Sequence, residues 1–260
     1  MQVFGDYARY YNLLYRDKDY QAEAEFVHEL LKKYAPTTKS ILELGCGTGK
    51  HAEQLVKWGY EVCGVDLSAD MLAQAEARSQ HLPPEQSAQL EFHQGDIRNF
   101  RLHRQFDAVI SLFHVFSYQT TNQDLQAAFA TAKAHLKPEG VLIFDCWYGP
   151  GVLSDRPTVR VKRLDDQEIT VTRIAEPLLN VNENLVTVNY QVLIKNATTQ
   201  QTSELQESHQ MRYLFKPEID LLLQCHKLEL IAYGEWMTNR IPNDKTWNVY
   251  AVAKFIGAGK

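Results

Sequence analysis

The chain has 260 residues, 45% hydrophobic and 23% charged, a composition typical of folded globular proteins and unlike that of disordered chains or fibres. It carries 27 Lys and Arg against 32 Asp and Glu, a formal charge of −5, which argues against a nucleic-acid binder held by basic charge. Its apolar stretches fall short of the ~20 residues that a membrane helix needs. The first residues show no secretory signal, and the 4 cysteines have no paired C-x-x-C spacing, which disfavours a zinc site and a disulfide framework. A cytoplasmic protein is expected.

Helical and strand patterns alternate from residue 20 to residue 146. The expected helices repeat apolar residues at helical spacing: 20–34, 50–58, 68–78 (with Ser68 as N-cap) and 122–136, which is expected to end at Lys137–Gly140. The expected strands are short apolar runs: 40–44, 61–65, 90–93, 106–112 and 141–146. Strands that alternate with helices in this way predict an α/β fold with a parallel sheet covered on both faces.

The pattern changes after Pro150. Residues 158–195 are rich in Val, Ile and Thr in near-alternation, with turn signals at 165–167 and 180–184, and a further strand is expected over 204–215. These strands predict an antiparallel insertion that packs on the sheet as a lid. The α/β pattern then resumes with a helix and two strands: 217–225, 228–233 and 247–255. Three parts are therefore expected, namely a core with an N-terminal flap, the insertion and the completion of the core: 1–150, 151–210 and 211–260.

The most informative segment is the run Glu43–Gly49, which joins a buried strand to a helix. Its glycines, Gly45, Gly47 and Gly49, let the backbone turn sharply and approach a ligand without a Cβ. Asp66 ends the next strand, where a carboxylate can accept both hydroxyls of a ribose. Strand, glycine turn, helix and acid together predict an adenosine site.

This run departs in two ways from the dinucleotide fingerprint Gly-x-Gly-x-x-Gly. The third glycine comes one residue early, and Glu43 would repel a pyrophosphate but can attract an ammonium directly or through water. S-adenosylmethionine has no phosphate, a cationic sulfonium and an amino-acid end, so it fits both departures. An NAD-dependent dehydrogenase is the disfavoured alternative.

Three segments in this order resemble the class I S-adenosylmethionine-dependent methyltransferases: the run Glu43–Gly49, Asp66-Leu67-Ser68 and Gly95-Asp96-Ile97. The resemblance implies a Rossmann-like, seven-stranded, mostly parallel sheet with an antiparallel β lid after the fifth strand, and S-adenosylmethionine as cofactor. It implies that Leu67 and Met71 hold the adenine ring and that Asp96 and the Ile97 backbone bind its amino group. Taken alone, Asp96 would more often be a helix cap or turn residue.

Two further residues complete the expected cofactor site. Cys46 lies within the glycine run, and Leu112 ends the strand expected over 106–112. The thiols of Cys46 and Cys63 are expected to be small buried fillers, which is the common role of free cysteine.

The N-terminal segment up to Tyr20 is dense in tyrosine and is expected to form a mobile flap. It resembles the leader of bacterial small-molecule methyltransferases that N,N-dimethylate nucleotide-linked amino sugars in macrolide pathways. The resemblance implies that Tyr11 and Tyr20 close on the methionine end of the cofactor, that Tyr7 contacts substrate and that Arg173 faces the sugar-nucleotide phosphates. On an alternating strand, however, an arginine such as Arg173 is more often a salt-bridged surface residue.

The acceptor is expected beyond the carboxyl ends of the strands. The loop after 106–112 contains His114 and Tyr118 and lacks the Asn/Asp-Pro-Pro-aromatic motif of DNA amino-methyltransferases. Histidine titrates near neutral pH, so His114 is the candidate base, the alternative being a buried histidine bonded to a carbonyl. The resemblance places Tyr118 near the acceptor, and Trp147 and Tyr148 are placed to wall a small pocket.

The amino-sugar enzymes have serines where this chain has His114 and Phe116, and a glycine-rich segment in place of 239–247. The expected function is methyl transfer from S-adenosylmethionine to a nitrogen or oxygen of a small molecule, with a nucleotide-linked amino sugar favoured. The alternatives are another natural-product amine and a catalytically silent adenosylmethionine-binding module. No nucleic-acid, membrane or metal partner is expected, and the oligomeric state stays open, a homodimer included.

Overall fold

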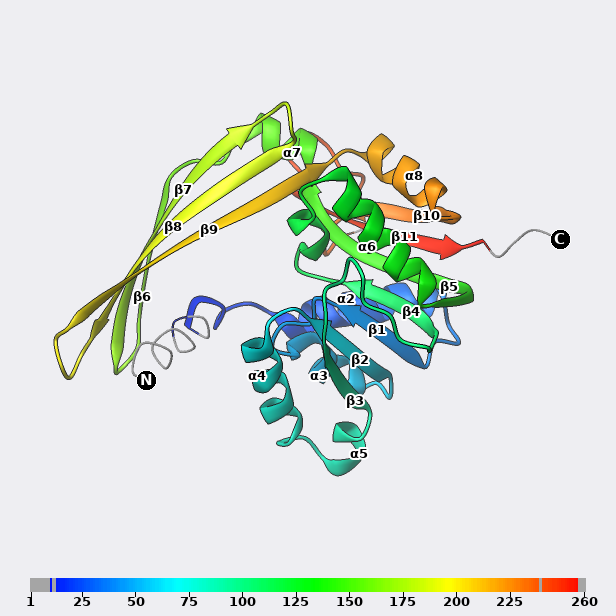
Figure 1. Ribbon diagram of the computed structural model, residues 1–260, viewed down its shortest axis with the longest axis horizontal. Coiled ribbons are helices and arrows are strands. Elements are labelled where there is room, and N and C mark those ends of the chain that lie inside the picture. Colours follow the sequence, from blue (N-terminus) through cyan, green and yellow to red (C-terminus); the bar gives the residue numbers. More distant parts are fainter. Residues whose placement is uncertain (1–9, 11–12, 239, 257–260) are drawn as a thin grey trace. The chain divides into compact units, whose positions relative to one another are not determined.

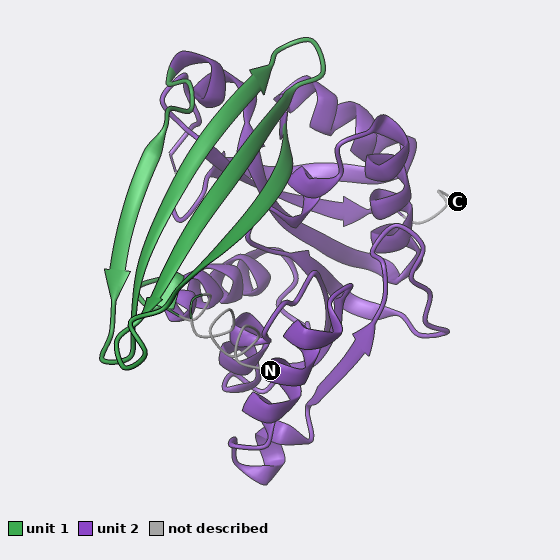
Figure 2. Cartoon of the chain, turned by 60° about the vertical axis from the view of Figure 1, so that its left-hand side comes forward, with its two compact units in different colours: residues 1–19, 155–212 green, residues 20–154, 213–260 purple. Residues whose placement is uncertain are grey.

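The computed structural model describes residue 10, residues 13–238 and residues 240–256. The chain divides into two compact units, coloured separately in Figure 2: unit 1 contains residues 1–19 and 155–212, and unit 2 contains residues 20–154 and 213–260. Unit 2 carries the alternating strands and helices and the last two strands, and unit 1 carries most of the antiparallel insertion. Among the described helices, none has both the length and the apolar character that crossing a bilayer takes.

Unit 2 contains the predicted helices and strands in the predicted order, with three short helical segments, α5, η1 and α7, that the sequence analysis did not predict (Figure 1). Its helices are α2 (Tyr20–Tyr34), α3 (Lys50–Val56), α4 (Ala69–Ser79), α5 (Pro84–Ser87), the 3-10 turn η1 (Val115–Tyr118), α6 (Asn122–Ala134), α7 (Gly149–Ser154) and α8 (Lys216–Cys225). Its strands are β1 (Ser40–Leu44), β2 (Glu61–Asp66), β3 (Leu90–Gln94), β4 (Phe106–Ser111), β5 (Leu136–Tyr148), β10 (Leu228–Glu235) and β11 (Asn248–Phe255).

These strands form one sheet within the described part of unit 2. β3, β2, β1, β4 and β5 lie side by side in that order and run parallel. β11 pairs antiparallel with β5, and β10 pairs antiparallel with β11. This arrangement confirms the predicted α/β fold with a mostly parallel sheet of seven strands, to which the end of β9 (Thr202–Leu214) adds a short parallel pairing with β5 at Tyr213 and Leu214. Because parallel strands end at the same edge, the loops after β1 to β5 converge there.

Neighbouring residues of the central strands pack on opposite faces of the sheet, as strands covered on both sides require. Leu42 of β1 joins a buried cluster that includes Phe129 of α6. Ile41, the preceding residue, joins a second cluster with Leu31 of α2 and Leu55 of α3. Each such side chain stabilises the fold by ~1.5–3 kcal/mol on full burial, so both faces of the sheet contribute a core.

Unit 1 is built on an antiparallel sheet in chain order: β6 (Arg160–Asp165), β7 (Ile169–Asn180), β8 (Leu185–Asn196) and β9 (Thr202–Leu214). The predicted turns are present, at 166–168 and 181–184. Leu13 and Leu14 pack with Val171 and Val192 in a third buried cluster. The predicted antiparallel insertion is confirmed, and its role as a lid stays a prediction.

Two local predictions are wrong between residues 134 and 154. The run Lys137–Gly140 is predicted to end a helix, but α6 ends at Ala134 and β5 begins at Leu136. Glu139 has a φ of 65°, and the register between β4 and β5 shifts in this region. The strand therefore accommodates Pro138 at an irregularity of the β4–β5 pairing. Residues 149–154, where no helix is predicted, form α7, whose glycines obscure the helical pattern.

Asp107, near the start of β4, ties together the amino ends of three neighbouring strands. Its Oδ2 accepts hydrogen bonds from the backbone N of Lys39 at 3.0 Å and of Ser40 at 2.9 Å, and its Oδ1 accepts one from Lys137 Nζ at 2.7 Å. Burial raises the pKa of this carboxyl, but the hydrogen bonds outweigh burial and lower the pKa from 3.8 to about 2.

We expect Asp107→Asn to lower the free energy of unfolding at neutral pH by about 1–3 kcal/mol, because several donors lose a charged acceptor. The pKa is lower in the folded than in the unfolded state, so this stabilisation is present above about pH 4 and is lost as the pH falls toward 2. Denaturant unfolding of both proteins over this pH range measures the effect. A stability difference that does not shrink on acidification would contradict the role given to Asp107.

Candidate functional site

The loops after the parallel strands carry most of the residues predicted to bind cofactor and acceptor. β1 is followed by Gly45–Gly49, β2 by Leu67, β3 by Asp96 and β4 by 112–118. Parallel pairing brings these loops to one edge of the sheet in unit 2. The candidate site lies along this edge.

The glycine loop, Gly45–Gly49, turns with positive φ angles of 78° at Gly45, 54° at Gly47 and 70° at Gly49, which glycine adopts without strain. A Cβ on Gly45 would lie 2.5 Å from Cγ2 of Val115, so the bare backbone is needed there for packing against η1. A Cβ on Gly47 would meet no atom within 4 Å. The loop backbone at Gly47 therefore borders open space, where a ligand can pack directly on it.

Asp66, the last residue of β2, fixes the glycine loop through its carboxylate. Gly47 N donates to Asp66 Oδ2 at 2.8 Å, and Ser68 N donates to Oδ1 at 2.9 Å. Each carboxylate oxygen can accept more than one hydrogen bond, so both keep capacity for further donors such as paired hydroxyls. Ser68 caps α4 as the sequence predicts, because its Oγ accepts from Met71 N at 3.3 Å.

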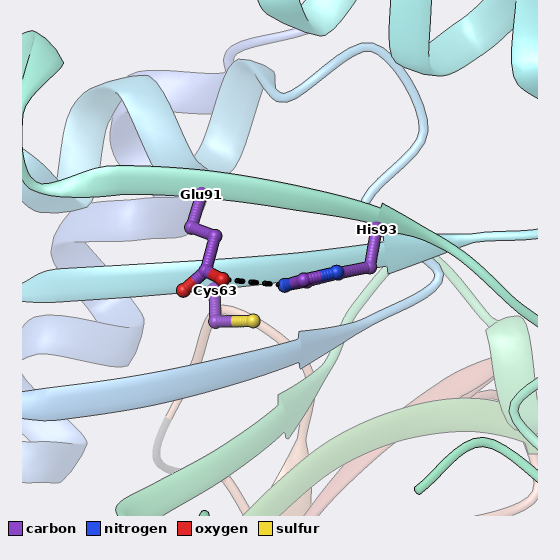
Figure 3. A group of neighbouring side chains, drawn as sticks. All are labelled: Cys63, Glu91 and His93. Atoms are coloured by element: carbon purple, nitrogen blue, oxygen red, sulfur yellow. Dashed lines mark hydrogen bonds and ion pairs between the residues drawn. The ribbon is translucent and has the colours of Figure 1, made fainter. Parts of the chain in front are cut away.

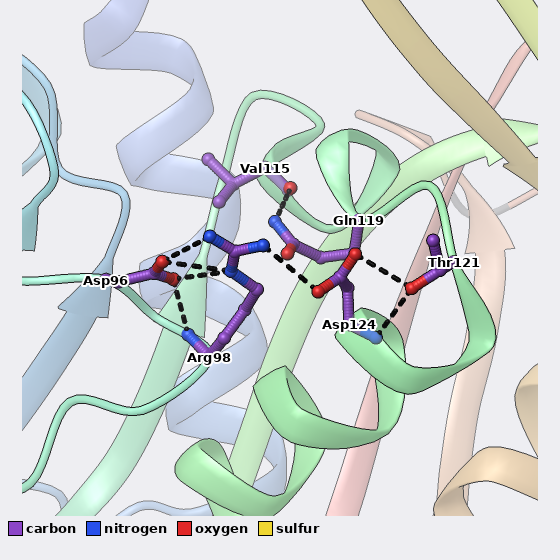
Figure 4. A network of polar contacts seen from close by, with 6 residues as sticks. All are labelled: Asp96, Arg98, Val115, Gln119, Thr121 and Asp124. Atoms are coloured by element: carbon purple, nitrogen blue, oxygen red, sulfur yellow. Dashed lines mark hydrogen bonds and ion pairs between the residues drawn. The ribbon is translucent and has the colours of Figure 1, made fainter.

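The turn after β3 contains a charged network around Asp96 (Figure 4). Arg98 Nε contacts both oxygens of Asp96 at 2.9 Å, and Arg98 Nη1 contacts Asp124 Oδ1 at 3.0 Å. The hydrogen bonds from Arg98 hold the pKa of Asp96 below its ordinary range, so this carboxylate is ionised at neutral pH. Thr121, the N-cap of α6, accepts from Asp124 N at 3.0 Å. Arg98 thus joins the β3 turn to the start of α6, a link that the sequence analysis missed.

The other predicted cofactor residues differ in exposure. Leu67 is 66% exposed and Met71 is half-buried, so both offer apolar surface. Ile97 is buried, which is compatible with its predicted contact through the backbone. Cys46 is a buried filler, and burial raises the pKa of its thiol. Leu112 is buried in the core cluster on the face of α2 and α3, so its side chain packs within the protein.

Two residues that flank the glycine loop, Glu43 and His51, form a buried row with Glu23 of α2. His51 Nε2 lies 2.8 Å from Glu23 Oε2, and His51 Nδ1 lies 3.5 Å from Glu43 Oε1. Burial lowers the pKa of His51, but the two carboxylates outweigh it and raise the pKa to about 9, so the ring is protonated at neutral pH. Burial raises the pKa of Glu43, against the opposing effect of His51. Glu43 Oε2 is buried without a hydrogen-bond partner.

Tyr20, predicted to lie at the methionine end of the cofactor, adjoins this row. Its ring centroid is 5.0 Å from that of His51, and Lys50 Nζ lies 4.7 Å from the Tyr20 ring centroid. His51, which the sequence analysis did not single out, therefore links Tyr20 to Glu43. Two other predicted residues of the leader, Tyr7 and Tyr11, lie outside the described residues.

The turn after β4 has an unusual backbone. Phe113 and His114 have φ angles of 65° and 62°, in the left-handed region that costs a non-glycine residue roughly 1–2 kcal/mol. His114 N donates to Asp145 Oδ1 at 3.1 Å, and His114 Nδ1 lies 2.6 Å from Asp145 Oδ2 without the alignment of a hydrogen bond. Asp145, in β5, is 1% exposed. A buried carboxylate that the sequence analysis missed thus fixes the position of His114.

The aromatic residues predicted to lie near the acceptor, Trp147, Tyr118 and Tyr148, differ in their surroundings. The ring centroid of Trp147 is 6.3 Å from that of His114, and Trp147 packs edge-on against Trp247 at 5.6 Å. Tyr118 is 47% exposed at the end of η1. Tyr148 instead packs against a tyrosine of β10 and the hydrophobic core. The structure therefore brings Trp147, but not Tyr148, to the candidate base.

Arg173 lies in β7 of unit 1 among phenol rings. Its guanidinium carbon is 4.8 Å from the ring centroid of Tyr190. Burial raises the pKa of Tyr10 to about 12, although the charge of Arg173 and its hydrogen bond to Tyr10 act in the opposite direction. Arg173 Nε is buried without a hydrogen-bond partner. The guanidinium thus keeps donor capacity for a ligand.

Cys63 of β2 forms a group with Glu91 and His93 of β3 that has the composition of a metal site (Figure 3). Their ligand atoms lie within 4.8 Å of one another. Glu91 is already paired with His93 at 2.7 Å and with Arg104 at 2.9 Å. Burial raises the pKa of Cys63 to about 12, so without a metal ion the thiol is protonated at neutral pH. The ion pairs account for the closeness of Glu91 and His93.

Comparison with known proteins gives the family. The family described as "Methyltransferase domain" matches residues 41–140. A dTDP-3-amino-3,4,6-trideoxy-alpha-D-glucopyranose N,N-dimethyltransferase from Streptomyces venezuelae is 37% identical over 190 residues, which are 72% of this chain and 76% of that protein. The chain belongs to the S-adenosylmethionine-dependent methyltransferases. It is therefore not an NAD-dependent dehydrogenase.

Solved structures support the same family. An S-adenosylmethionine-dependent methyltransferase from Clostridium acetobutylicum is similar with a TM-score of 0.81 and 25% identity, covering 98% of this chain and 100% of that chain. An amino pentose methyltransferase from Micromonospora echinaspora, solved with S-adenosylmethionine bound, is similar with a TM-score of 0.74 and 27% identity, covering 98% of this chain and 97% of that chain. S-adenosylmethionine is thus the methyl donor of this methyltransferase.

We expect Gly47→Ala to weaken mainly cofactor binding, and Gly45→Ala to lower the stability of the fold as well. Gly47→Ala should weaken binding of S-adenosylhomocysteine by about tenfold or more, near 1.4 kcal/mol, because a methyl group enters the space that the loop borders. Its stability should fall by only ~1–2 kcal/mol, the cost of a left-handed alanine. Gly45→Ala should destabilise further, because its Cβ also collides with Val115. Calorimetric titration and denaturant unfolding measure both effects, and unchanged affinity in a folded Gly47→Ala protein would remove the glycine loop from the cofactor site.

Proposed function

We propose that this methyltransferase methylates the amino group of a nucleotide-linked amino sugar, and does so twice to give the N,N-dimethyl product. The observation that carries the proposal is the 37% identity, over 72% of the chain, to an enzyme named for that reaction on a dTDP-amino sugar. The similarity to an amino pentose methyltransferase, at 27% identity over 98% of the chain, supports it. An oxygen acceptor or another natural-product amine is an outcome that the experiment below would reveal.

S-adenosylmethionine supplies a methyl group on a cationic sulfonium, open to attack by an aligned nucleophile. In our proposal Asp66 accepts hydrogen bonds from the ribose hydroxyls with the capacity left beside Gly47 N and Ser68 N. Leu67 and Met71 contact the adenine ring. Asp96, held ionised by Arg98, and the Ile97 backbone receive the adenine amino group.

The methionine end of the cofactor is assigned to the other flank of the glycine loop. Glu43 offers a buried carboxylate oxygen without a partner, which suits the ammonium group. Tyr20 packs beside His51, the residue that contacts Glu43. This end of the cofactor therefore meets charged groups, whereas the adenine end meets Leu67 and Met71.

His114 is the proposed general base. The closeness of its Nδ1 to Asp145 favours a proton on Nδ1, which leaves Nε2 as the acceptor. An amine that binds protonated has no lone pair for attack until a base takes its proton, and Nε2 supplies that base. Trp147 and Tyr118 orient the acceptor in this proposal, since methyl transfer depends chiefly on in-line positioning.

Arg173 is the proposed contact for the phosphates of the nucleotide. A guanidinium matches the geometry of phosphate oxygens, and the buried, unpartnered Nε of Arg173 supports such a ligand. The cation stacks on Tyr190 in unit 1, which holds the guanidinium in one orientation.

We expect the protein to methylate dTDP-linked amino sugars with S-adenosylmethionine, with mass spectrometry detecting first one and then two added methyl groups. Arg173→Leu should raise KM for the nucleotide-linked sugar about tenfold or more, because a charge-assisted contact to phosphate is lost, while KM for S-adenosylmethionine holds. Arg163→Leu, at an exposed position of β6, is the matched control. Equal turnover of free amino sugars or unrelated amines would overturn the nucleotide-linked substrate.

We expect His114→Ala to lose on the order of 10²–10⁴ in kcat at neutral pH, because no base then takes the proton of the acceptor. Affinity for S-adenosylhomocysteine should hold, since His114 is not assigned to the cofactor. Rates across pH are compared with those of His103→Ala, at an exposed position of the loop before β4. A loss of only a few-fold, with the pH profile of the unaltered enzyme kept, would show that His114 merely positions an acceptor that binds as the neutral amine.

A further inference from the structure

The carboxylate of Glu43 is buried, and only one of its two oxygens has a partner. It is 1% exposed, its Oε1 lies 3.5 Å from His51 Nδ1, and its Oε2 has no hydrogen-bond partner. A buried carboxylate oxygen without a donor is costly, so its presence points to a ligand that completes it. A cationic N–H group is the donor that binds a carboxylate most strongly.

A second observation concerns the other end of the row. Glu23 contacts His51 Nε2 at 2.8 Å, and Trp236 Nε1 donates to the second oxygen of Glu23 at 3.4 Å. Both nitrogens of the His51 ring are therefore directed at carboxylates, which prevents the ring from turning. Residues from α2, α3 and β1 and the segment after β10 hold the row in one geometry.

The charges of the row leave one negative charge in excess when all three groups are ionised, since two carboxylates face one imidazolium. Other groups near the row are the ring of Tyr20, which packs on His51, Lys50, whose ammonium lies over the Tyr20 ring, and Asp66, whose negative charge also acts on Glu43. Glu43 Oε2 is buried without a hydrogen-bond partner, and burial raises the pKa of this carboxyl, an effect that a cationic ligand would oppose. A ligand with a single ammonium would neutralise the excess charge of the row.

We propose that Glu23 and His51 are positioning residues for the cofactor: they hold the Glu43 carboxylate so that its free oxygen receives the ammonium of the methionine end. Neither residue touches the cofactor, and both act through Glu43. The inference rests on the placement of that ammonium at Glu43 under the proposed function. A purely structural ion pair gives no reason for the unpartnered oxygen, since apolar side chains of the same volume stabilise a core at least as well.

The experiment compares two ligands that share the adenosine group. S-adenosylhomocysteine carries the ammonium, and methylthioadenosine lacks the whole amino-acid end. Glu23→Gln keeps the shape of the side chain and removes its charge, and His51→Gln keeps an amide between the two carboxylates. We expect each variant to bind S-adenosylhomocysteine about tenfold more weakly, because Glu43 is less well held, and methylthioadenosine with unchanged affinity. Calorimetric titration measures both affinities.

Glu29→Gln is the matched control, because Glu29 lies on the same helix in an exposed pair with Lys32 at 3.0 Å. It should change neither affinity. Glu43→Gln tests the placement of the ammonium separately and should weaken S-adenosylhomocysteine by about 10- to 100-fold and methylthioadenosine not at all. If Glu43→Gln has no effect, the placement fails, and the positioning role fails with it.

Two other outcomes overturn the inference while leaving that placement intact. Equal weakening of both ligands by Glu23→Gln would show a structural role only, and no weakening of either would show that Glu43 holds its position unaided. Affinity for methylthioadenosine also reports the folded fraction of each sample. If Glu23→Gln does not fold, Glu23→Asp, which keeps the charge but draws it back from His51, should show the same selective loss.

Discussion

The parallel pairing of β1 with β2 on one side and β4 on the other sets the positions of the glycine loop and of the loops that follow β2 and β4. The ladder continues past the end of β1, where Gly45 N and Cys46 N both donate to the carbonyl of Val65, at 2.7 Å and 3.0 Å. The glycine loop is thus an extension of the sheet. Its backbone is placed by strand register, and the Asp66 carboxylate fixes its next turn at Gly47.

Two buried carboxylates lie near this edge of the sheet, and each contacts a histidine. Glu43 faces His51, and Asp145 faces His114. A cationic cofactor is favoured near such groups, because charges interact more strongly where water is excluded. The pairs differ in exposure, since the His51 side chain is 6% exposed and that of His114 is 15% exposed. Under the proposed function, the more exposed His114 is the histidine that reaches the acceptor.

Features set by neighbouring residues could be predicted from the sequence, and features set by distant segments could not. The order of helices and strands, the glycine loop and the Ser68 cap follow from local apolar spacing and backbone chemistry. The contact of Glu23 with His51 joins residues 28 apart and that of His114 with Asp145 joins residues 31 apart, so no motif contains either pair. The run 137–140 has the local chemistry of a turn, but Leu136 and Val141 on either side of it both pair with β4, so β5 continues through the run. The roles given to individual site residues stay predictions.

The left-handed backbone at Phe113 and His114 has a consequence for redesign of this enzyme. Positions with φ near 60° accept glycine or asparagine more readily than β-branched residues, so a library that randomises this turn would include many proteins more strained than the native one. Tyr118 and Trp147 sit on backbone without that restriction, in η1 and β5. Under the proposed function, changes in acceptor range are therefore best sought at these two side chains, with the Phe113–His114 turn and the glycine loop left unchanged.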